Sequence, residues 1–409
     1  MKNIRRITTF KSMRQIIKGF CIWRCYSFFL LIIGVIAILM SGCGTLTTWD
    51  MIPGEATATH FDLTEEVNAI TGSMVSNRQT PGLVVGLLLS DGSTRFFGYG
   101  TTEQGGGVIP GPDTLFAIGS LSKGFLGGVA ASLVQEGKLA WTDTLSTLLP
   151  TETPLSPGAA KISLEQLAAH ISGLPRQPIT LRTLAYFIQY LFTGDNFYRH
   201  LDHDTIMDYL VDFSANSTQS PQYSNIGYGV MGYALECQTG QSVDTLLFER
   251  ITGPLGLAHT GYTPEELPGF SIRARGHAGD QPKIIRRGQP VPDWRFTDIM
   301  RGSAAIYSTA RDLLNFAAAH YRRDGSSLSI ALTDTLKVRY PSRRKAAAVA
   351  WIVDDLDGIR ITYQVGIVAG YTSYIGLNAD NDTAVVVLQN AFNWDYSVGH
   401  KLMVLMAGR

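Results

Sequence analysis

The chain has 409 residues, of which 45% are hydrophobic and 17% are charged, so it can bury one or two sizeable cores. Its formal net charge of zero hides an uneven distribution, because residues 1–42 contain seven of the 34 basic residues and no acidic residue. The remaining chain carries 27 basic and 34 acidic residues, and this mildly acidic balance argues against nucleic acid as a partner.

The first segment is typical of an export signal. Its basic residues precede thirteen apolar residues at 28–40, which are too few for an ordinary membrane span and suit the core of a signal peptide. Two small residues then precede Cys43, an arrangement that resembles the bacterial lipoprotein cleavage box, in which the cysteine becomes the lipidated first residue. We therefore expect a signal peptide at 1–42, lipid attachment at Cys43 and a tether at 43–60. These features would place the protein in the bacterial cell envelope, facing the periplasm or the outer surface; the alternative is an uncleaved anchor with an incidental cysteine.

Strand-like segments lie at both ends of the remaining chain. After an amphipathic segment at 61–77 that predicts a helix, two strand-like runs are joined by Asp91-Gly92, which is a strong hairpin signal. Further strand-like runs near the other end are followed by a helical pattern at 397–406. The predicted strands are 82–89, 94–99, 347–353, 359–367, 371–377 and 384–388.

Helical patterns dominate the middle of the chain. We therefore predict an α/β fold of the α+β type, in which an antiparallel sheet flanked by helices is built from both termini and a mostly helical lobe at about 115–320 is inserted. Residues 61–409 would form this domain, with a ligand cleft between the lobes.

The aromatic stretch 184–192 is expected to be a buried helix, with a substrate-lining or membrane-touching role as the alternative. Residues 276–301 are expected to form a long loop that could rim the site.

The stretch 116–125 carries Ser-x-x-Lys at the head of an apolar run rich in small residues. Positions three apart share one face of a helix, so Ser120 Oγ and the Lys123 amine would point into the same space. Serine needs an adjacent base to act as a nucleophile, and a desolvated lysine can lose its proton and become that base. Ser120 and Lys123 are therefore candidates for nucleophile and base, although the motif alone is weakly specific.

A second motif, Tyr223-Ser-Asn225, opens another apolar helical run. A phenol near ammonium groups is expected to have a lowered pKa and to shuttle a proton. The amide of Asn225 could hold a substrate carbonyl and also the lysine.

A third motif, Gln364-Val-Gly366-Ile367, is typical of an edge strand whose glycine lets a substrate backbone approach closely. The backbone N–H of Ile367 could complete an oxyanion hole with that of Ser120. Gln364, Gly366 and Ile367 are therefore candidate substrate-binding residues.

These ordered motifs resemble those of the serine β-lactamase and DD-peptidase superfamily, specifically its class C β-lactamase-like branch, which uses Tyr-x-Asn as its second motif. That branch also includes esterases and D-amino-acid peptidases. The resemblance covers roughly residues 60–408. Its supporting stretches are 112–116, 136–139, 164–175, 253–256 and 308–313.

The resemblance implies a role for each motif residue. Ser120 would be the acylated nucleophile, Lys123 its activating base, and Tyr223 the second base that relays a proton to the leaving group. Asn225 would orient the substrate. The family usually has Lys or His where this chain has Gln364, and this departure puts recognition of a substrate carboxylate in doubt.

We therefore expect an exported serine hydrolase that acts on an ester, an amide or peptide, or a β-lactam, with poor β-lactam turnover. The alternative from another class is a catalytically silent penicillin-recognising or cell-wall-binding lipoprotein. The expected partners are a small-molecule or peptide substrate and, through the lipid anchor, the membrane. No cofactor or metal is expected.

Other reactive side chains carry less weight. Cys237 lies in a helical pattern and is expected to be a small buried hydrophobe. His170 falls in the family-typical stretch 164–175 and is expected to be structural. His200 and His203 have loose metal-ligand spacing without further partners, so they are expected to lie in a solvated turn.

Overall fold

A computed structural model describes residues 62–178, 180–214, 221–342, 345–356 and 358–408. Residues 61–409 form one compact unit. The predicted signal peptide, Cys43 and the tether lie outside the described residues. Within the described ranges, no helix has the length and apolar character needed to cross a membrane.

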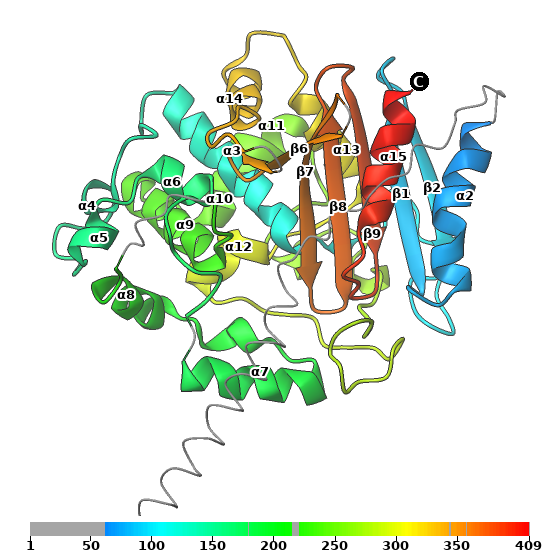
Figure 1. Ribbon diagram of the computed structural model, residues 1–409, viewed down its shortest axis with the longest axis horizontal. Coiled ribbons are helices and arrows are strands. Elements are labelled where there is room, and N and C mark those ends of the chain that lie inside the picture. Colours follow the sequence, from blue (N-terminus) through cyan, green and yellow to red (C-terminus); the bar gives the residue numbers. More distant parts are fainter. Residues whose placement is uncertain (1–61, 179, 215–220, 343–344, 357, 409) are drawn as a thin grey trace, which may run out of the picture. The chain divides into compact units, whose positions relative to one another are not determined.

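An antiparallel sheet of seven strands lies at the centre of this unit, in the order β2-β1-β9-β8-β7-β6-β5 (Figure 1). The N-terminal strands lie beside the C-terminal ones, because β1 pairs with both β2 and β9. The prediction of a sheet built from both termini is therefore confirmed. The strands are β1 (Gly82–Leu88), β2 (Thr94–Gly100), β5 (Ala346–Ala347), β6 (Ile352–Leu356), β7 (Ile359–Val368), β8 (Tyr371–Asn378) and β9 (Thr383–Gln389).

Helices cover both faces of the sheet, which is why β1, β8 and β9 are buried along their whole length. On one face, α2 (Leu63–Ser76) and α15 (Ser397–Ala407) pack around a core that includes Val85, Tyr374 and Leu402. On the other face, α13 (Ala310–Ala319) packs against β1 and β9, and a larger core continues from there into the helical part of the chain.

The chain between β2 and β5 is mostly helical, as predicted, and it includes a small sheet of β3 (Phe116–Ala117) and β4 (Tyr307–Ser308). Two helices with long buried stretches, α3 (Ser122–Gln135) and α9 (Asn225–Thr239), contact each other at its centre. The other α-helices are α4 (Leu145–Leu148), α5 (Pro157–Ala160), α6 (Leu164–Ala168), α7 (Leu181–Thr193), α8 (His203–Val211), α10 (Val243–Leu247), α11 (Gly253–Leu255), α12 (Arg301–Ala304) and α14 (Ser327–Thr335).

The predicted strand at 347–353 is wrong in its bounds. Its residues 348–351 form a bend in which Ala348 N–H donates to Trp351 O at 2.9 Å, and β6 begins only after it. The run is apolar because it packs against α3 and not because it continues a strand. A Cβ built at Gly127 of α3 would lie only 3.0 Å from Val349 Cγ1.

The aromatic stretch 184–192 does lie in a helix, α7, but the prediction that this helix is buried is wrong. Thr183 and Tyr190 are buried, whereas Leu181 and Phe192 are 70% and 62% exposed. The helix is amphipathic with an apolar solvent-facing side, and residue type alone does not show which side meets the core. The predicted loop at 276–301 is irregular over 276–297, but its last residues are wrong, because Asp298–Met300 form a 3₁₀ helix and Arg301 begins α12.

Candidate active site

Ser120 lies in a single 3₁₀ turn, Gly119–Leu121, that leads directly into α3. Gly119 has a φ of 52°, a backbone conformation that favours glycine. Lys123, in the first turn of α3, places its Nζ 3.0 Å from Ser120 Oγ. The spacing Ser-x-x-Lys thus brings the two predicted groups into hydrogen-bond contact.

Lys123 is fully buried, and its amine also donates to Ser303 O at 2.6 Å. Burial, and secondly the positive charge of Arg176, hold the pKa of Lys123 well below its usual value. The neutral amine is thereby favoured, and it can accept the proton of Ser120. Sequence reasoning missed Ser303 because it contributes a main-chain carbonyl, which every residue has.

Small residues let α3 approach its neighbours closely. A Cβ built at Gly124 would lie 3.3 Å from the Trp351 ring, and one at Gly128 would lie 3.1 Å from a methyl group of Leu332. The helix that carries the Ser-Lys pair is therefore fixed by packing on several sides, as a preorganised site requires.

Tyr223 lies two residues before the start of α9, and its ring faces the same amine. The Lys123 Nζ lies 4.9 Å from the centroid of that ring, and Ser120 is a hydrogen-bond partner of its phenol. Burial raises the pKa of Tyr223, although the charge of Arg176 and the hydrogen bond with Ser120 oppose the rise. The expectation of a lowered pKa for Tyr223 is therefore wrong. Burial raises this pKa, and burial depends on the tertiary structure, which the motif alone does not show.

Asn225, the first residue of α9, is also buried, with 7% of its surface exposed. Its Nδ2 donates to Tyr198 OH at 2.9 Å, whereas the Lys123 amine donates to Ser120 and Ser303. Among the described residues, Asn225 Oδ1 has no hydrogen-bond partner. The structure thus places Asn225 beside the site without the expected contact to the lysine.

The end of β7 forms another wall of the site, because it extends beyond its pairing with β6 and contacts the Ser120 turn. A Cβ built at Gly366 would lie 2.0 Å from Ile118 O, so only glycine permits this close approach. Ile367 N lies beside the same turn, since a Cβ built at Gly119 would be 3.0 Å from it. The two N–H groups predicted to form an oxyanion hole therefore lie on adjacent segments.

Gln364, in the same strand, is 2% exposed. Its Nε2 donates to Ala350 O at 2.6 Å, and its Oε1 accepts a hydrogen bond from Val365 N–H at 3.0 Å. Both polar atoms of the amide thus have partners inside the protein. In this placement Gln364 ties β7 to the bend at 348–351, a contact that the sequence did not indicate.

The segment that joins α6 to α7 also reaches the site. The ring of His170 lies 4.4 Å from that of Tyr223, and Arg176 Cζ lies 4.7 Å from the centroid of the same ring. Sequence reasoning took His170 as structural and missed Arg176. The family-typical stretch 164–175 was the only signal that this segment matters.

The remaining candidates lie outside this group. Within the ranges that the structure describes, no cluster of three or more His, Cys, Asp or Glu could hold a metal ion. His203 is exposed, but His200 is buried and stacks on Tyr186, so the expected solvated turn is wrong for His200. Cys237 is half-buried, and not fully buried as expected.

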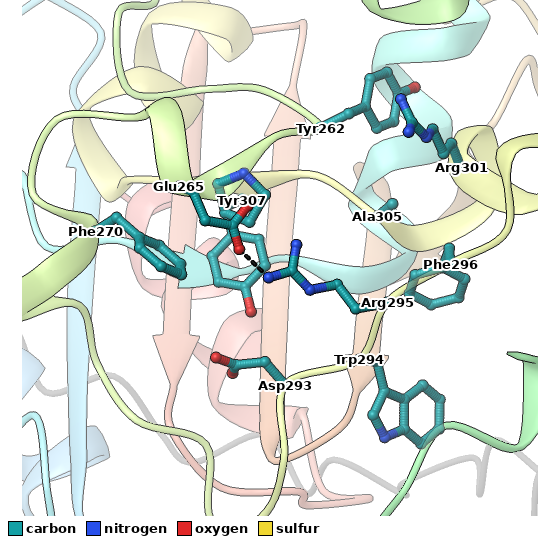
Figure 2. Close-up of a pocket in the computed structure, with 11 residues that line it drawn as sticks. Tyr262, Glu265, Phe270, Asp293, Trp294, Arg295, Phe296, Arg301, Ala305 and Tyr307 are labelled. Carbon is teal, nitrogen blue, oxygen red and sulfur yellow. Dashed lines mark hydrogen bonds and ion pairs between the residues drawn. The ribbon is translucent and has the colours of Figure 1, made fainter.

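A separate pocket is lined by aromatic and charged side chains (Figure 2). Glu265 and Arg295 form an ion pair within it. Tyr307, another lining residue, belongs to β4, which pairs with the strand just before the Ser120 turn. None of the three predicted catalytic residues lines this pocket, so it is a neighbour of the candidate site and not the site itself.

Sequence comparisons agree with the motifs. The family model described as Beta-lactamase matches residues 66–405. Penicillin-binding protein 4 of Amycolatopsis lactamdurans is 27% identical over 256 residues, which are 60% of each chain. The D-alanyl-D-alanine-carboxypeptidase/endopeptidase AmpH of Escherichia coli (strain K12) is 28% identical over 58% of this chain and 57% of that protein. The unguisins hydrolase ungD' of Aspergillus campestris is 26% identical over 76% of this chain and 58% of that protein. The chain therefore spans less than two thirds of the length of these relatives.

Solved structures share the fold. A class C beta lactamase from Rhodobacter sphaeroides superposes with a TM-score of 0.70 at 22% identity, covering 84% of this chain and 99% of that one. D-alanine carboxypeptidase AmpC from Burkholderia cenocepacia superposes with a TM-score of 0.69 at 19% identity, covering 85% and 99%. The predicted antiparallel sheet flanked by helices is thus confirmed as the architecture of these proteins.

Proposed function

The chain belongs to the beta-lactamase family, and from this premise we propose that it is a serine hydrolase that works through an acyl-enzyme on Ser120. The observation that carries the proposal is the 3.0 Å contact between Ser120 Oγ and the fully buried amine of Lys123. A buried amine with a depressed pKa is the kind of base that a serine nucleophile needs.

In the proposed acylation, Ser120 Oγ attacks the substrate carbonyl carbon while its proton passes to the Lys123 amine. The N–H groups of Ser120 and Ile367 would stabilise the negative charge that develops on the carbonyl oxygen. Tyr223, protonated because its pKa is raised, would pass its proton to the leaving group as the scissile bond breaks and be reprotonated from Lys123. In deacylation, water attacks the acyl-enzyme ester and gives a proton to the Lys123 amine, directly or through the Tyr223 phenol. Ser120 is then released as the hydroxyl.

Asn225 is proposed to orient the substrate. Its Oδ1, buried and without a partner among the described residues, is an acceptor that a substrate N–H would satisfy. A buried unpaired acceptor costs free energy, about 1–3 kcal/mol in typical proteins, so its pairing would favour binding.

We propose that esters, amides or peptides are better substrates than β-lactams. A charged partner for a substrate carboxylate contributes roughly 1.5–3 kcal/mol, which is on the order of 10- to 100-fold in kcat/KM. Gln364 carries no charge, and both polar atoms of its amide are engaged inside the protein. The AmpH protein and the teichoic acid D-alanine hydrolase of Staphylococcus aureus, which is 27% identical over 53% of this chain, are named for D-alanine substrates and support this direction.

The preference is tested by comparing kcat/KM for p-nitrophenyl butyrate and for a chromogenic cephalosporin. The ester carries no carboxylate and needs no charged partner, so we expect it to be the better substrate, and Gln364→Lys should raise kcat/KM for the cephalosporin but not for the ester. Efficient hydrolysis of the cephalosporin would overturn the proposed preference while leaving the serine mechanism intact.

A catalytically silent penicillin-recognising protein is the second candidate. The hydrogen-bonded Ser120–Lys123 pair favours the enzyme, because a silent protein has no need of a buried base beside its serine. In the purified protein, Ser120→Ala should abolish ester turnover. Turnover that persists in Ser120→Ala would rule out the proposed nucleophile, and no turnover in the parent would favour the silent protein.

We also propose that the protein is exported and lipid-anchored through Cys43. The basic leader, the apolar residues 28–40 and the small residues before Cys43 support this location.

A further inference from the structure

The residues immediately before and after Tyr223 both form hydrogen bonds with His170. Gln222 N–H donates to His170 O at 2.7 Å, and Ser224 N–H donates to His170 Nδ1 at 3.2 Å. The main chain is thus held immediately before and immediately after the tyrosine. A side chain whose backbone is fixed on both sides has little freedom to change its direction.

Two further hydrogen bonds fasten the same two segments. Ser224 Oγ donates to Pro175 O at 2.8 Å, and Asn225 N–H donates to Arg176 O at 3.2 Å. His170 and Ser224 each contribute both the side chain and the main chain to this interface.

The ring of His170 also packs on the tyrosine itself. Its centroid lies 4.4 Å from that of Tyr223 and 5.0 Å from that of Tyr228. His170 is buried, with 8% of its surface exposed, and has a φ of 59°, a left-handed conformation that few residues other than glycine adopt. Such backbone conformations persist where the surrounding structure enforces them, and they cluster at functional sites.

The hydrogen bonds define the state of the ring. Because Nδ1 accepts the Ser224 N–H, the ring is neutral and its proton is on Nε2. Burial, followed by the charges of Lys123 and Arg176, holds the pKa of His170 well below its usual value, which agrees with a neutral ring. The phenols of Tyr223 and Tyr228, whose rings pack against His170, also have raised pKa values and are protonated.

We propose that His170 is a positioning residue, which fixes the Tyr223 phenol against Ser120 and Lys123 by holding the main chain on both sides of it and by packing against its ring. His170 touches neither the reacting atoms nor the substrate in this account and acts only through Tyr223. The inference rests on the proposed function, because the placement of Tyr223 matters only if that phenol takes part in the reaction.

Two substitutions separate the contributions of the ring. His170→Gly removes the ring and its acceptor but suits the positive φ, so it is less disruptive to folding than His170→Ala. His170→Asn keeps an acceptor near the position of Nδ1 and also tolerates this conformation. For a neutral ester, we expect His170→Gly to lower kcat by on the order of 10- to 100-fold with KM little changed, because small misplacements of catalytic groups cost this much. His170→Asn should recover a large part of the loss.

A double-mutant cycle with Tyr223→Phe tests whether His170 acts through the tyrosine. If it does, His170→Gly/Tyr223→Phe should be no slower than Tyr223→Phe alone, whereas independent losses would multiply. His320 provides the matched control: it is also buried, its Nδ1 lies 2.8 Å from Phe316 O, and its ring neighbours are Phe316 and Trp351. His320→Gly should leave kcat per folded molecule within about threefold, because it lies outside the contacts to Tyr223.

Rates are expressed per folded molecule, with the folded fraction taken from near-ultraviolet circular dichroism and thermal melting. A multiplicative loss in the double variant, or an unchanged kcat in His170→Gly, would overturn the positioning role. If His170→Gly does not fold, the double-mutant cycle with Tyr223→Phe is run with His170→Asn in its place. The kcat of His170→Asn is then compared with that of His170→Leu, and a higher value in His170→Asn supports the positioning role. Persistent turnover in Ser120→Ala would instead contradict the proposed function, so the two failures are distinguishable.

Discussion

Lys123 can act as a base only when its amine is neutral. A lysine with the ordinary pKa of 10.5 would make kcat/KM rise about tenfold for each pH unit up to that value. Burial and the charge of Arg176 lower the folded-state pKa, so the rate should fall only as the pH drops through that lower value and should be constant above it. We expect a plateau that begins well below pH 10.5 when kcat/KM for a neutral ester is measured between about pH 6 and 10. A tenfold rise per unit throughout this range would contradict the depressed pKa.

Tyr223 and Tyr228 both face the Lys123 amine, at 4.9 and 5.6 Å from their ring centroids, but only one is placed to relay a proton. The Tyr228 hydroxyl donates to Ala168 O at 2.7 Å, whereas the Tyr223 hydroxyl is paired with Ser120. Tyr223→Phe should therefore lower kcat by at least ~10²-fold, the low end for a general acid or base.

The control, Tyr228→Phe, should lose stability by about 0.5–1.5 kcal/mol, the net contribution of one hydrogen bond, because Ala168 O keeps the Ala350 N–H as a donor at 3.0 Å. Its kcat should change by less than about threefold, since its hydroxyl has no part in the relay. Equal losses of kcat in the two variants would show that the Tyr223 hydroxyl has no special part in the proton relay.

The site residues differ in how well the sequence could predict them. Ser120 and Lys123 meet because a local, helix-like spacing brings them together, and local geometry can be inferred from spacing. The direction of the Tyr223 pKa shift could not be inferred, because it depends on burial by segments distant in the chain. Gln364 was assigned to substrate contact by its place in a motif, but its side chain turns to Ala350, 14 residues away.

At the level of elements, the close approach of β7 to the Ser120 turn depends on Gly366. A Cβ there would lie 2.0 Å from Ile118 O, so one of the two segments must move. Gly366→Ala should lower the free energy of unfolding by more than about 2 kcal/mol, the range typical of overpacking, and should reduce acylation at the same time.

Gly72→Ala in α2 is the matched control, because a Cβ at that position would meet no atom within 4 Å. Alanine is the better helix former, so this variant should gain roughly 0.5–1 kcal/mol without a change in activity. Urea denaturation of both variants gives the comparison. A Gly366→Ala protein as stable and as active as the parent would contradict the tight contact.

The elements themselves were predictable where pattern and turn chemistry agree. Asp91-Gly92 marked the β1–β2 hairpin, and Gly92 has the φ of 81° that such a turn requires. The segment 347–353 was misassigned because an apolar run that packs on a helix and an apolar run in a buried strand have the same composition. The exposed apolar side of α7 could not be assigned either, because amphipathicity does not show what a helix packs against.

For the whole molecule, the arrangement of strands at both ends and helices between them was enough to predict the fold, because the strands at each end need partners and the other end supplies them. Location is a separate property, and it depends on residues 1–61, which lie outside the described ranges. If Cys43 is the lipid site, Cys43→Ser should abolish incorporation of radiolabelled palmitate and release the protein from the membrane fraction. Labelling that is unchanged in this variant, or that is absent from the parent, would contradict a lipid anchor at Cys43.

The central claim is that Ser120 becomes acylated with the help of the amine 3.0 Å from it. It is tested most directly by reacting the purified protein with a fluorescent penicillin and with an activated fluorophosphonate, followed by mass spectrometry of its peptides. We predict one covalent adduct of each reagent on the peptide that contains Ser120, none in Ser120→Ala, and labelling at least ~10²-fold slower in Lys123→Ala. An adduct on another residue, or labelling of Ser120→Ala at the rate of the parent, would contradict the account.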